Sequence, residues 1–278
     1  MSQFAFYMQK KQLDNSTKII HNCRAHNGFE LLDIFDISIC NTISQKILLI
    51  IFHLLISTGT GFVNKIIKAF FKIFNISVIF ESDYKFNERF LSSMGGIRFY
   101  YGGWHCEKYF VQNRSELINR FDFKKINDQT NNKYIEKIDK TNSVSVHVRR
   151  GDYLVGVNAD FFGNVCTLKY YEKAFEIIES KVSSPHYYIF SDDIEWVRKN
   201  IIRNNVTYID CNRGIDSWKD MYLMTRCAHH IVSNSTFSWW GAWLNTNSGN
   251  ITICPFRFTK DDIETQVYPD NWYRVYEY

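Results

Sequence analysis

The chain has 278 residues, of which 45% are hydrophobic, 22% charged and 17% aromatic, and its formal net charge is +4. This length suits one large domain or two smaller ones, and the composition excludes a disordered protein. The small positive charge fits an anionic small ligand or an anionic membrane surface, and it argues against a nucleic-acid partner.

The first half of the chain mixes helical segments, short strands and polar connections. Residues 2–11 (SQFAFYMQKK) show a helical pattern, whereas residues 16–22 (STKIIHN) predict a strand. The N-terminus is unlike a secretion signal, because lysines follow its apolar residues and no cleavage-like end is present.

Residues 47–56 (ILLIIFHLLI) form a strongly apolar run that is too short to span a bilayer. Three lysines, Lys65, Lys68 and Lys72, are then interleaved with apolar residues. Such a basic amphipathic stretch predicts either peripheral contact of residues 46–74 with an anionic membrane or a solvent-facing helix whose apolar stripe meets the core.

The cysteines are odd in number and widely spaced, without C-x-x-C pairs or Cys/His clusters that have zinc-site spacing. We therefore expect reduced, mostly buried thiols in a cytoplasmic protein, and no metal site. The seven are Cys23, Cys40, Cys106, Cys166, Cys211, Cys227 and Cys254.

The second half alternates predicted strands and helices. The polar segment 127–142 is the best candidate for a boundary, which divides the chain into domains 1–140 and 141–278. This alternation predicts a parallel sheet covered by helices on both faces. The predicted strands are 144–148, 187–190, 206–210, 229–233 and 251–255, and the predicted helices lie at 167–180, 193–201, 216–228 and 236–245.

Polar residues collect at three of these strand ends. Because the carboxyl ends of parallel strands share one edge of a sheet, these residues are expected to meet there. They are His147, Arg149, Arg150, Gly151 and Asp152 after the first strand, Ser191, Asp192 and Asp193 after the second, and Ser233, Asn234, Ser235, Thr236 and Ser238 after a third.

The residue types at these ends are complementary. Arg149 and Arg150 offer planar cations that suit phosphate oxygens. Residues 233–236 place hydroxyls and backbone N–H groups at a helix N-terminus, which is a second anion site. Asp192 or Asp193 suits ribose hydroxyls or base N–H groups. Together these residues predict a nucleotide-diphosphate pocket without a glycine-rich P-loop.

Each group also has a structural interpretation. Arg150 would pair with Asp152 or with a helix carboxylate, and residues 192–193 and 235–236 would cap the helices that follow them. The coincidence of three polar strand ends favours a site. His147 is interpreted as an orienting residue rather than a metal ligand. The tryptophans of residues 236–245 are interpreted as helix–sheet packing rather than a stacking platform.

Four segments resemble motifs of the α-1,2-fucosyltransferases, in the bacterial branch related to the blood-group H enzymes. They are GGWHCEKYF (102–110), HVRRGDY (147–153), FSDD (190–193) and SNSTFSWWGAWLN (233–245). The resemblance runs over nearly the whole chain. It implies a GT-B-like α/β fold, in which two Rossmann-like domains with mainly parallel sheets face each other across a cleft.

The resemblance also implies an activity: inverting transfer of fucose from GDP-β-L-fucose to the 2-hydroxyl of a terminal galactose in a surface glycan. Neither a cofactor nor a metal is expected. The C-terminal half would bind GDP-fucose and the N-terminal half the galactose-terminated acceptor. The enzyme would work in the cytoplasm, with a candidate peripheral contact at the inner face of the bacterial membrane.

Individual roles follow from the same resemblance. Arg149 matches the arginine expected at the pyrophosphate, where it would stabilise charge on the departing GDP. Asp152 and Glu107 are the candidates for the base that deprotonates the acceptor hydroxyl. The remaining donor-binding candidates are His147, Arg150, Asp192, Asp193, Ser233, Asn234, Ser235, Thr236 and Ser238.

The start of the chain departs from the family pattern. Family members begin with a strand and a turn of the type GGLGNQ, whereas this sequence begins with the helix-like MSQFAFYMQKK. We favour a gene start assigned too late; the alternative is a domain that has lost its first strand.

Three other functions are weighed against this one. One is a fucosyltransferase of another linkage, such as α-1,6. Another is an inactive, truncated sugar-nucleotide-binding remnant. The third is an adhesion loop at Arg150-Gly151-Asp152, which would need secretion and an exposed tip rather than the end of a hydrophobic strand.

Overall fold

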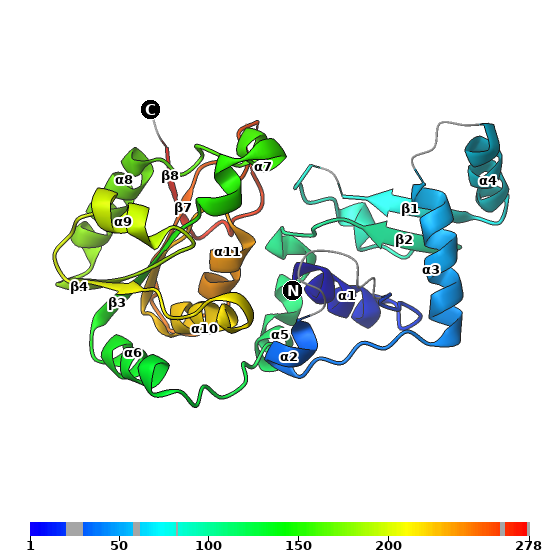
Figure 1. The fold of residues 1–278 in the computed structure, drawn as a ribbon. Helices are drawn as coiled ribbons and strands as arrows, with labels where there is room; N and C mark the ends of the chain where they lie inside the picture. The colour runs from blue at the N-terminus through cyan, green and yellow to red at the C-terminus, as the bar shows by residue number, and fades with distance from the viewer. Residues whose placement is uncertain (21–29, 58–61, 82, 262–264, 277–278) are drawn as a thin grey trace. The chain divides into compact units, whose positions relative to one another are not determined.

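The structure is a computed structural model that describes residues 1–20, 30–57, 62–81, 83–261 and 265–276. The chain forms two compact units, Met1–Lys124 and Lys125–Tyr278 (Figure 1). This division lies ahead of the expected boundary near residue 140, and it places residues 125–140 with the second unit. Each unit is considered by itself below.

The first unit contains a two-stranded parallel sheet. Strands β1 (Ile76–Phe80) and β2 (Ile97–Tyr101) pair in register, Ile76 with Ile97 and Phe80 with Tyr101. The helices of this unit are α1 (Ser2–Leu13), α2 (Leu31–Phe35), α3 (Ile43–Ile56), α4 (Phe62–Ile73) and α5 (Arg114–Arg120), with short 3₁₀ turns η1 (Glu88–Phe90), η2 (Glu107–Tyr109) and η3 (Val111–Asn113).

Aromatic side chains form much of the core of the first unit. The expected helix over residues 2–11 is confirmed as α1, and its Phe6 ring stacks on Trp104 with ring centroids 4.0 Å apart. Tyr109 meets both rings edge-on. These contacts bury the segment around residue 104 beneath α1.

The strand expected over residues 16–22 is not found where that segment is described. Residues 16–20 follow a turn in which the Asp14 carboxylate accepts hydrogen bonds from the backbone N–H and the hydroxyl of Ser16. The Ile19 carbonyl accepts from the Gln45 side chain instead of a neighbouring strand. Residues 21–22 lie outside the described part of the chain.

The apolar run at residues 47–56 lies within α3 and the basic stretch lies largely within α4. Helix α3 begins with a capping box, since the Thr42 side chain accepts from the Gln45 N–H and the Gln45 side chain accepts from the Thr42 N–H. Among the described residues, no helix has the length and apolar character needed to cross a membrane.

The second unit is built on a six-stranded parallel sheet in the order β5-β4-β3-β6-β7-β8. The expected strand–helix alternation is confirmed, with β8 as an addition that the sequence pattern did not indicate. The strands are β3 (Asn142–Val148), β4 (Pro185–Ser191), β5 (Val206–Ile209), β6 (His229–Ile231), β7 (Thr252–Pro255) and β8 (Tyr273–Val275).

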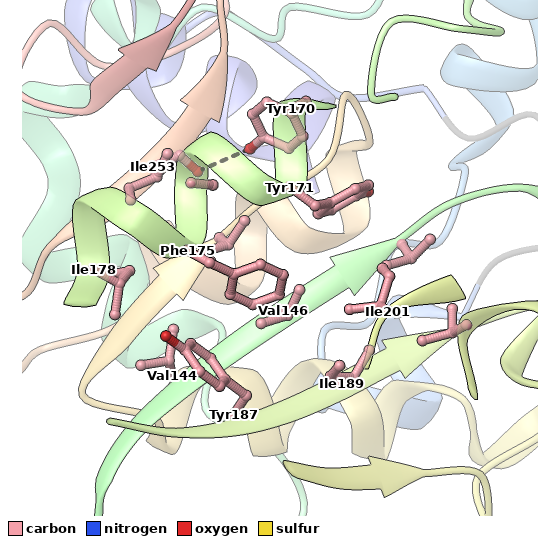
Figure 2. Close-up of a cluster of buried hydrophobic side chains, with 14 of the residues drawn as sticks. Val144, Val146, Tyr170, Tyr171, Phe175, Ile178, Tyr187, Ile189, Ile201 and Ile253 are labelled. Carbon is pink, nitrogen blue, oxygen red and sulfur yellow. Dashed lines mark hydrogen bonds between the residues drawn. The ribbon is translucent and has the colours of Figure 1, made fainter. Parts of the chain in front are cut away.

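Helices cover both faces of this sheet. On one face, α8 (Leu168–Lys181) packs on Val144 and Val146 of β3 (Figure 2), and α9 (Ile194–Asn200) contributes Ile194 and Val197 to the same cluster. On the other, α6 (Gln129–Asp139) and α10 (Trp218–Arg226) pack on Tyr188 and Phe190 of β4. The burial of alternate residues on opposite faces follows from the two-residue period of a strand.

Helix α6 corrects the view of residues 127–142 as a polar connection. Asp128 caps the helix by accepting from the Asn131 N–H, and Ile138 is fully buried against the sheet. Asn131 is buried in the middle of this polar segment, where its side chain exchanges two hydrogen bonds with that of Asn212. A helix anchored by a buried amide pair lacks the strong apolar periodicity that sequence patterns detect.

The tryptophans of α11 (Thr236–Trp243) are buried, as expected for packing residues. Trp239 stacks on Trp243, and its indole N–H donates to the Val267 carbonyl. The six cysteines of the described chain are free thiols. Three are buried, namely Cys106, Cys227 and Cys254, whereas Cys40 and Cys211 are exposed, Cys166 is half-buried and Cys23 lies outside the described residues.

The α/β class with parallel sheets is therefore confirmed in both units. That the two units face each other across a cleft stays a prediction.

Candidate active site

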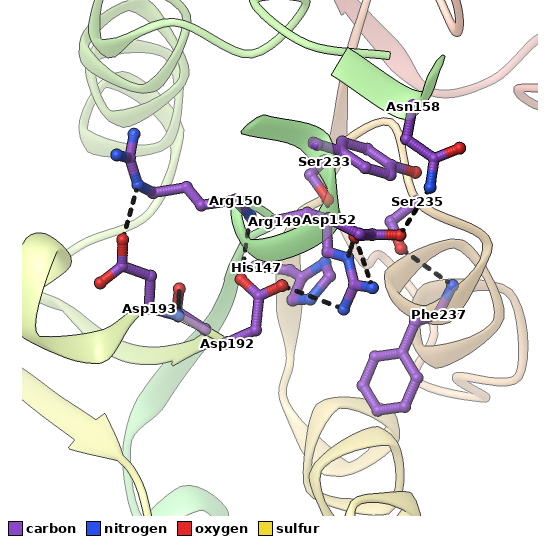
Figure 3. Close-up of polar contacts among 12 residues, drawn as sticks. His147, Arg149, Arg150, Asp152, Asn158, Asp192, Asp193, Ser233, Ser235 and Phe237 are labelled. Atoms are coloured by element: carbon purple, nitrogen blue, oxygen red, sulfur yellow. Dashed lines mark hydrogen bonds and ion pairs between the residues drawn. The ribbon is translucent and has the colours of Figure 1, made fainter. Parts of the chain in front are cut away.

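Strand order brings the three polar strand ends of the second unit together. Strand β3 lies between β4 and β6, and all three run parallel, so their carboxyl ends share one edge. Arg149 follows β3, Asp192 follows β4 and Ser233 lies just beyond β6. Figure 3 shows the side chains of this edge grouped around Arg149.

Arg149 is held by two carboxylates. Its Nε donates to Asp152 Oδ1 at 2.9 Å, and its Nη2 lies 2.7 Å from the same oxygen. Its Nη1 lies 3.1 Å from Asp192 Oδ2. A guanidinium carries five N–H bonds, so these three contacts leave two that are able to meet an anion. The Arg149 side chain remains 34% exposed.

Arg150 points elsewhere. Its guanidinium lies over the ring of Trp196, with the Cζ atom 3.7 Å from the ring centroid, and its Nε donates to Asp193 Oδ2 at 3.0 Å. In Figure 3 the Arg150 side chain extends toward Asp193, while that of Arg149 extends toward the side of Ser235. The two adjacent arginines therefore have different surroundings, and of the two it is Arg149 that extends toward the serine loop (residues 233–238).

Asp192 and Asp193 combine structural and electrostatic roles. Asp192 Oδ1 accepts from the backbone N–H of Arg150, while its Oδ2 faces Arg149. Asp193 caps α9 by accepting from the Trp196 N–H at 3.2 Å. The capping interpretation and the arginine-pairing interpretation both hold for Asp193.

Gly151, three residues after β3, lies close to the Asp192 side chain that follows β4. A Cβ atom at this position would lie 2.6 Å from Asp192 Oδ2, the oxygen that faces Arg149. Any side chain at residue 151 would therefore displace that carboxylate.

His147 is buried on the face of the sheet opposite Val146 and Val148, as expected. Its Nδ1 lies 2.8 Å from the Ser233 hydroxyl, and its ring lies 5.6 Å from that of Phe237. Burial, reinforced by the charge of Arg149, lowers the pKa of His147 to about 3. The imidazole is thus neutral at physiological pH and orients the start of the serine loop.

The serine loop divides into buried and accessible positions. Ser233 bonds His147, Asn234 donates to the Phe162 and Phe258 carbonyls, and the Ser238 hydroxyl donates to the Ser235 carbonyl. These three side chains serve other protein groups, so their expected contact with the donor stays a prediction.

Ser235 and Thr236 begin helix α11. Ser235 is its N-cap, with its hydroxyl 3.4 Å from the Phe237 nitrogen, and Thr236 is half-buried. The first-turn N–H groups of a helix have no partner within the helix. The Thr236 hydroxyl and the first-turn N–H groups other than that of Phe237, which the Ser235 hydroxyl caps, are what this loop offers to an anion.

Asp152 has both carboxylate oxygens occupied. Oδ1 faces Arg149, and Oδ2 accepts from Asn158 Nδ2 at 3.1 Å. Asn158 belongs to α7 (Gly156–Phe161), which follows the 3₁₀ turn η4 (Gly151–Leu154). These contacts favour a role for Asp152 in positioning Arg149 over a role as base. They also disfavour adhesion, because neither the arginine nor the aspartate of the Arg-Gly-Asp triplet is unengaged.

Several contributing residues were not identified from the sequence. Trp196, in the first turn of α9, stacks on Arg150, and Asn158 supports Asp152. Tyr153 donates to the Asn234 carbonyl and so joins the arginine segment to the serine loop. The sequence signal that would have identified Trp196 was its position three residues after Asp193, the cap of α9.

Glu107 lies in η2 of the first unit, and its role as a base stays a prediction. A second carboxylate holds the preceding loop. Glu81 Oε2 accepts from the N–H groups of Gly103 and Trp104 at 2.9 and 3.1 Å. Burial raises the pKa of Glu81. Glu81 directly follows the apolar segment 76–80, which is the signal that would have found it.

Among the described residues, no group of three or more His, Cys, Asp or Glu side chains comes together as a metal site. That the transfer reaction needs no metal stays a prediction.

Several known proteins that are similar in sequence to this chain are named as glycosyltransferases. It is 32% identical to an α-1,2-colitosyltransferase of Escherichia coli over 97% of this chain and 92% of that protein. It is 36% identical to the O-antigen biosynthesis glycosyltransferase WbnK of Escherichia coli over 48% of this chain and 45% of that protein. The human galactoside α-(1,2)-fucosyltransferase 1 is 33% identical over 44% of this chain and 33% of that protein.

Solved structures similar to this chain include the α-1,6-fucosyltransferase NodZ soaked with GDP-fucose, with a TM-score of 0.34 and 16% identity. That alignment covers 55% of this chain and 53% of NodZ, and a TM-score this low does not by itself assign a fold. The family assignment rests on sequence: residues 44–276 match the profile of Glycosyl transferase family 11. This chain belongs to Glycosyl transferase family 11, and it is a glycosyltransferase.

Proposed function

We propose that this enzyme is a galactoside α-1,2-fucosyltransferase that uses GDP-β-L-fucose and acts on a terminal galactose of a surface glycan. The observation that carries the proposal is the position of Arg149 at the carboxyl edge of β3, on the side of the sheet where α11 begins. A cation with two N–H bonds to spare, next to the N-terminus of a helix, suits a diphosphate.

The reaction would proceed by inverting displacement at the anomeric carbon of fucose. The galactose 2-hydroxyl attacks that carbon as a base takes its proton, and the bond to the diphosphate breaks with its electrons moving to the phosphate oxygen. Arg149 and the N–H groups of α11 would stabilise the charge that develops on the departing GDP. Because they bind charge that grows as the bond breaks, their stabilisation is larger in the transition state than in the ground state.

Asp152 and Asp192 would set the orientation of the guanidinium before the donor arrives. Their side chains are 43% and 26% exposed, so water remains close to both. A diphosphate would bind the two remaining N–H bonds of Arg149 while both carboxylates stay in place. Because the contacts of Asp152 favour a positioning role, Glu107 is the preferred one of the two candidates for the base.

A second donor has a specific observation in its favour. The relative that aligns with 97% of this chain is an α-1,2-colitosyltransferase. Colitose is fucose without its 3-hydroxyl group. The pyrophosphate and the nucleoside of the two sugar nucleotides are identical, so the contacts of Arg149 do not distinguish them.

The test is a donor and acceptor panel with linkage analysis of the product. Purified enzyme is incubated with GDP-fucose or GDP-colitose and galactose-terminated acceptors, and acceptors with a 2-deoxygalactose terminus serve as the matched control. We expect an α-1,2-linked fucosyl product that is absent with the 2-deoxy control. A fucosyl product at another hydroxyl contradicts the linkage, and turnover of GDP-colitose alone contradicts the donor.

A further inference from the structure

The positive charge of this protein is concentrated in one stretch of the chain. Residues 37–80 contain Lys46, Lys65, Lys68 and Lys72 but no Asp, Glu or Arg. The whole chain has 33 Lys and Arg and 29 Asp and Glu, so removing these four lysines leaves 29 of each sign. The net charge of +4 therefore belongs entirely to this stretch, which includes α3 and α4 of the first unit.

Helix α4 exposes large apolar side chains beside these lysines. Ile66, Phe70 and Ile73 are 52%, 54% and 81% exposed, and their spacing of four and three residues places them on one face of the helix. Phe74, directly after the helix, is 59% exposed and contacts the Phe70 ring. Lys65, Lys68 and Lys72 are exposed as well. Helix α4 is therefore amphipathic and open to solvent on both sides, with the apolar stripe on one side and the three lysines on the other.

Helix α3 adds a second exposed apolar stripe. Ile43, Ile47, Ile50 and Leu54 recur at spacings of four, three and four residues, and their exposed fractions run from 42% to 80%. The opposite side anchors the helix, since Leu55 is buried and the Phe52 ring contacts those of Phe99 and Tyr101 in β2. Helices α3 and α4 contact each other and β1 (Figure 1).

A soluble protein rarely leaves so many large apolar side chains open on adjoining helices without a partner for them. The chemistry of the partner follows from the charges. A second copy of the same surface would bring lysines against lysines, with no carboxylate in residues 37–80 to pair them. An anionic lipid bilayer supplies both negative headgroups for the lysines and acyl chains for the apolar stripe.

We propose that α3 and α4 dock on the surface of an anionic lipid bilayer. The exposed isoleucine and phenylalanine side chains enter the boundary between headgroups and acyl chains, and Lys65, Lys68 and Lys72 meet the headgroups. This surface lies in the first unit and shares no residue with the Arg149 site. Docking therefore places the enzyme at a membrane without taking part in the transfer step.

The first test measures how much full-length protein sediments with vesicles. Phosphatidylcholine mixed with phosphatidylglycerol is expected to bind the protein, whereas phosphatidylcholine alone binds little. Binding should disappear when NaCl shortens the Debye length to about 3 Å. Equal binding to both kinds of vesicle, or none to the anionic kind, overturns the proposal.

The second test locates the charges. The triple variant Lys65→Gln, Lys68→Gln, Lys72→Gln should partition on the order of 100-fold more weakly into the anionic vesicles, because each lysine contributes a factor of about five. The matched control changes three exposed lysines of the second unit, Lys133, Lys140 and Lys199, to glutamine. Both variants lose the same charge, so equal weakening would overturn the location.

The third test concerns the apolar side chains and a competing occupant. The variant Phe70→Ser, Ile73→Ser should also lose vesicle binding, whereas a control with Ile202→Ser and Ile215→Ser, both exposed in the second unit, should not. Sedimentation velocity without lipid decides whether a second copy covers the surface instead. A dimer that the Phe70→Ser, Ile73→Ser variant converts to a monomer overturns the proposal.

Discussion

Replacing Arg149 by alanine tests the centre of the candidate site. The side chain lies between Asp152 and Asp192 and offers its two remaining N–H bonds at the edge where α11 begins. Loss of one preorganised donor at a developing negative charge typically lowers kcat by about 10²–10³, which corresponds to about 3–4 kcal/mol. Because Arg149 would supply both hydrogen bonds and a full charge, we expect the upper end of this range.

The same substitution should change stability little. The Arg149, Asp152 and Asp192 side chains are 34%, 43% and 26% exposed, so solvent screens both ion pairs. Exposed ion pairs contribute about 1 kcal/mol or less each. We therefore expect a loss of about 1 kcal/mol in the free energy of unfolding, which leaves the protein folded while transfer falls by orders of magnitude.

A matched control is available on α9. Arg198 pairs with Asp210 at 2.7 Å and is 39% exposed, so Arg198→Ala removes a similar ion pair from the same unit. Its transfer rate should stay near that of the unaltered enzyme. A third variant, Arg149→Lys, keeps the charge but not the planar fork, and it should fall between the other two.

The assay follows initial rates of GDP release at saturating acceptor, together with urea unfolding of each variant. Calorimetric binding of GDP separates a loss of affinity from a loss of turnover. Normal GDP-fucose turnover by Arg149→Ala, with the unaltered pattern of product, would refute the assignment of Arg149 to the diphosphate.

Three further predictions concern the same unit. Gly151→Ala should displace Asp192 from Arg149 and weaken GDP binding about tenfold, as calorimetry would show; unchanged affinity would mean that Asp192 does not orient the arginine. Burial lowers the pKa of His147 and that of His230 to about 3. The free energy of unfolding should therefore fall as pH drops below about 6.5, by about 2 kcal/mol per histidine at pH 5. In urea unfolding, His230→Gln should remove the part of this loss that belongs to His230. Burial raises the pKa of Asp220 to about 7, so the cost of ionising this carboxyl in the folded protein grows as pH rises from 4 to 7. Asp220→Asn should therefore stabilise the protein by about 4 kcal/mol at pH 8 but little at pH 4, and equal Tm gains at both pH values would contradict this.

Local pattern determined much of the second unit. The alternation of short apolar strands with amphipathic helices predicted β3 to β7 and α8 to α11, because a two-residue or 3.6-residue period is visible within a few residues. Capping was also readable locally, since the Thr167 hydroxyl accepts from the Tyr170 N–H at the predicted start of α8. Once these strands were assigned, the polar residues that follow three of them, Arg149, Asp192 and Ser233, could be placed at the strand ends.

Other features escaped the sequence because they depend on distant partners. Helix α6 is a polar segment whose Asn131 finds its partner 81 residues later in Asn212. The Glu81 carboxylate likewise accepts hydrogen bonds from the backbone N–H groups of Gly103 and Trp104, which lie far from it in the sequence. No local period records which remote group a polar side chain will meet.

The contacts of Arg149 and Arg150 show most clearly how local sequence and tertiary structure contribute to this site. The sequence by itself placed Arg149 and Arg150 at the end of a buried strand, and with them the chemistry of an anion site. Only the tertiary structure gave the two arginines different surroundings, because the order β4-β3-β6 puts Asp192 on one side of β3 and the serine loop on the other. Trp196 and Asp193 then hold Arg150, while the Arg149 side chain extends toward the side of Ser235, the N-cap of α11 (Figure 3). Strand order is a property of the whole sheet, and it cannot be read from the residues of one strand.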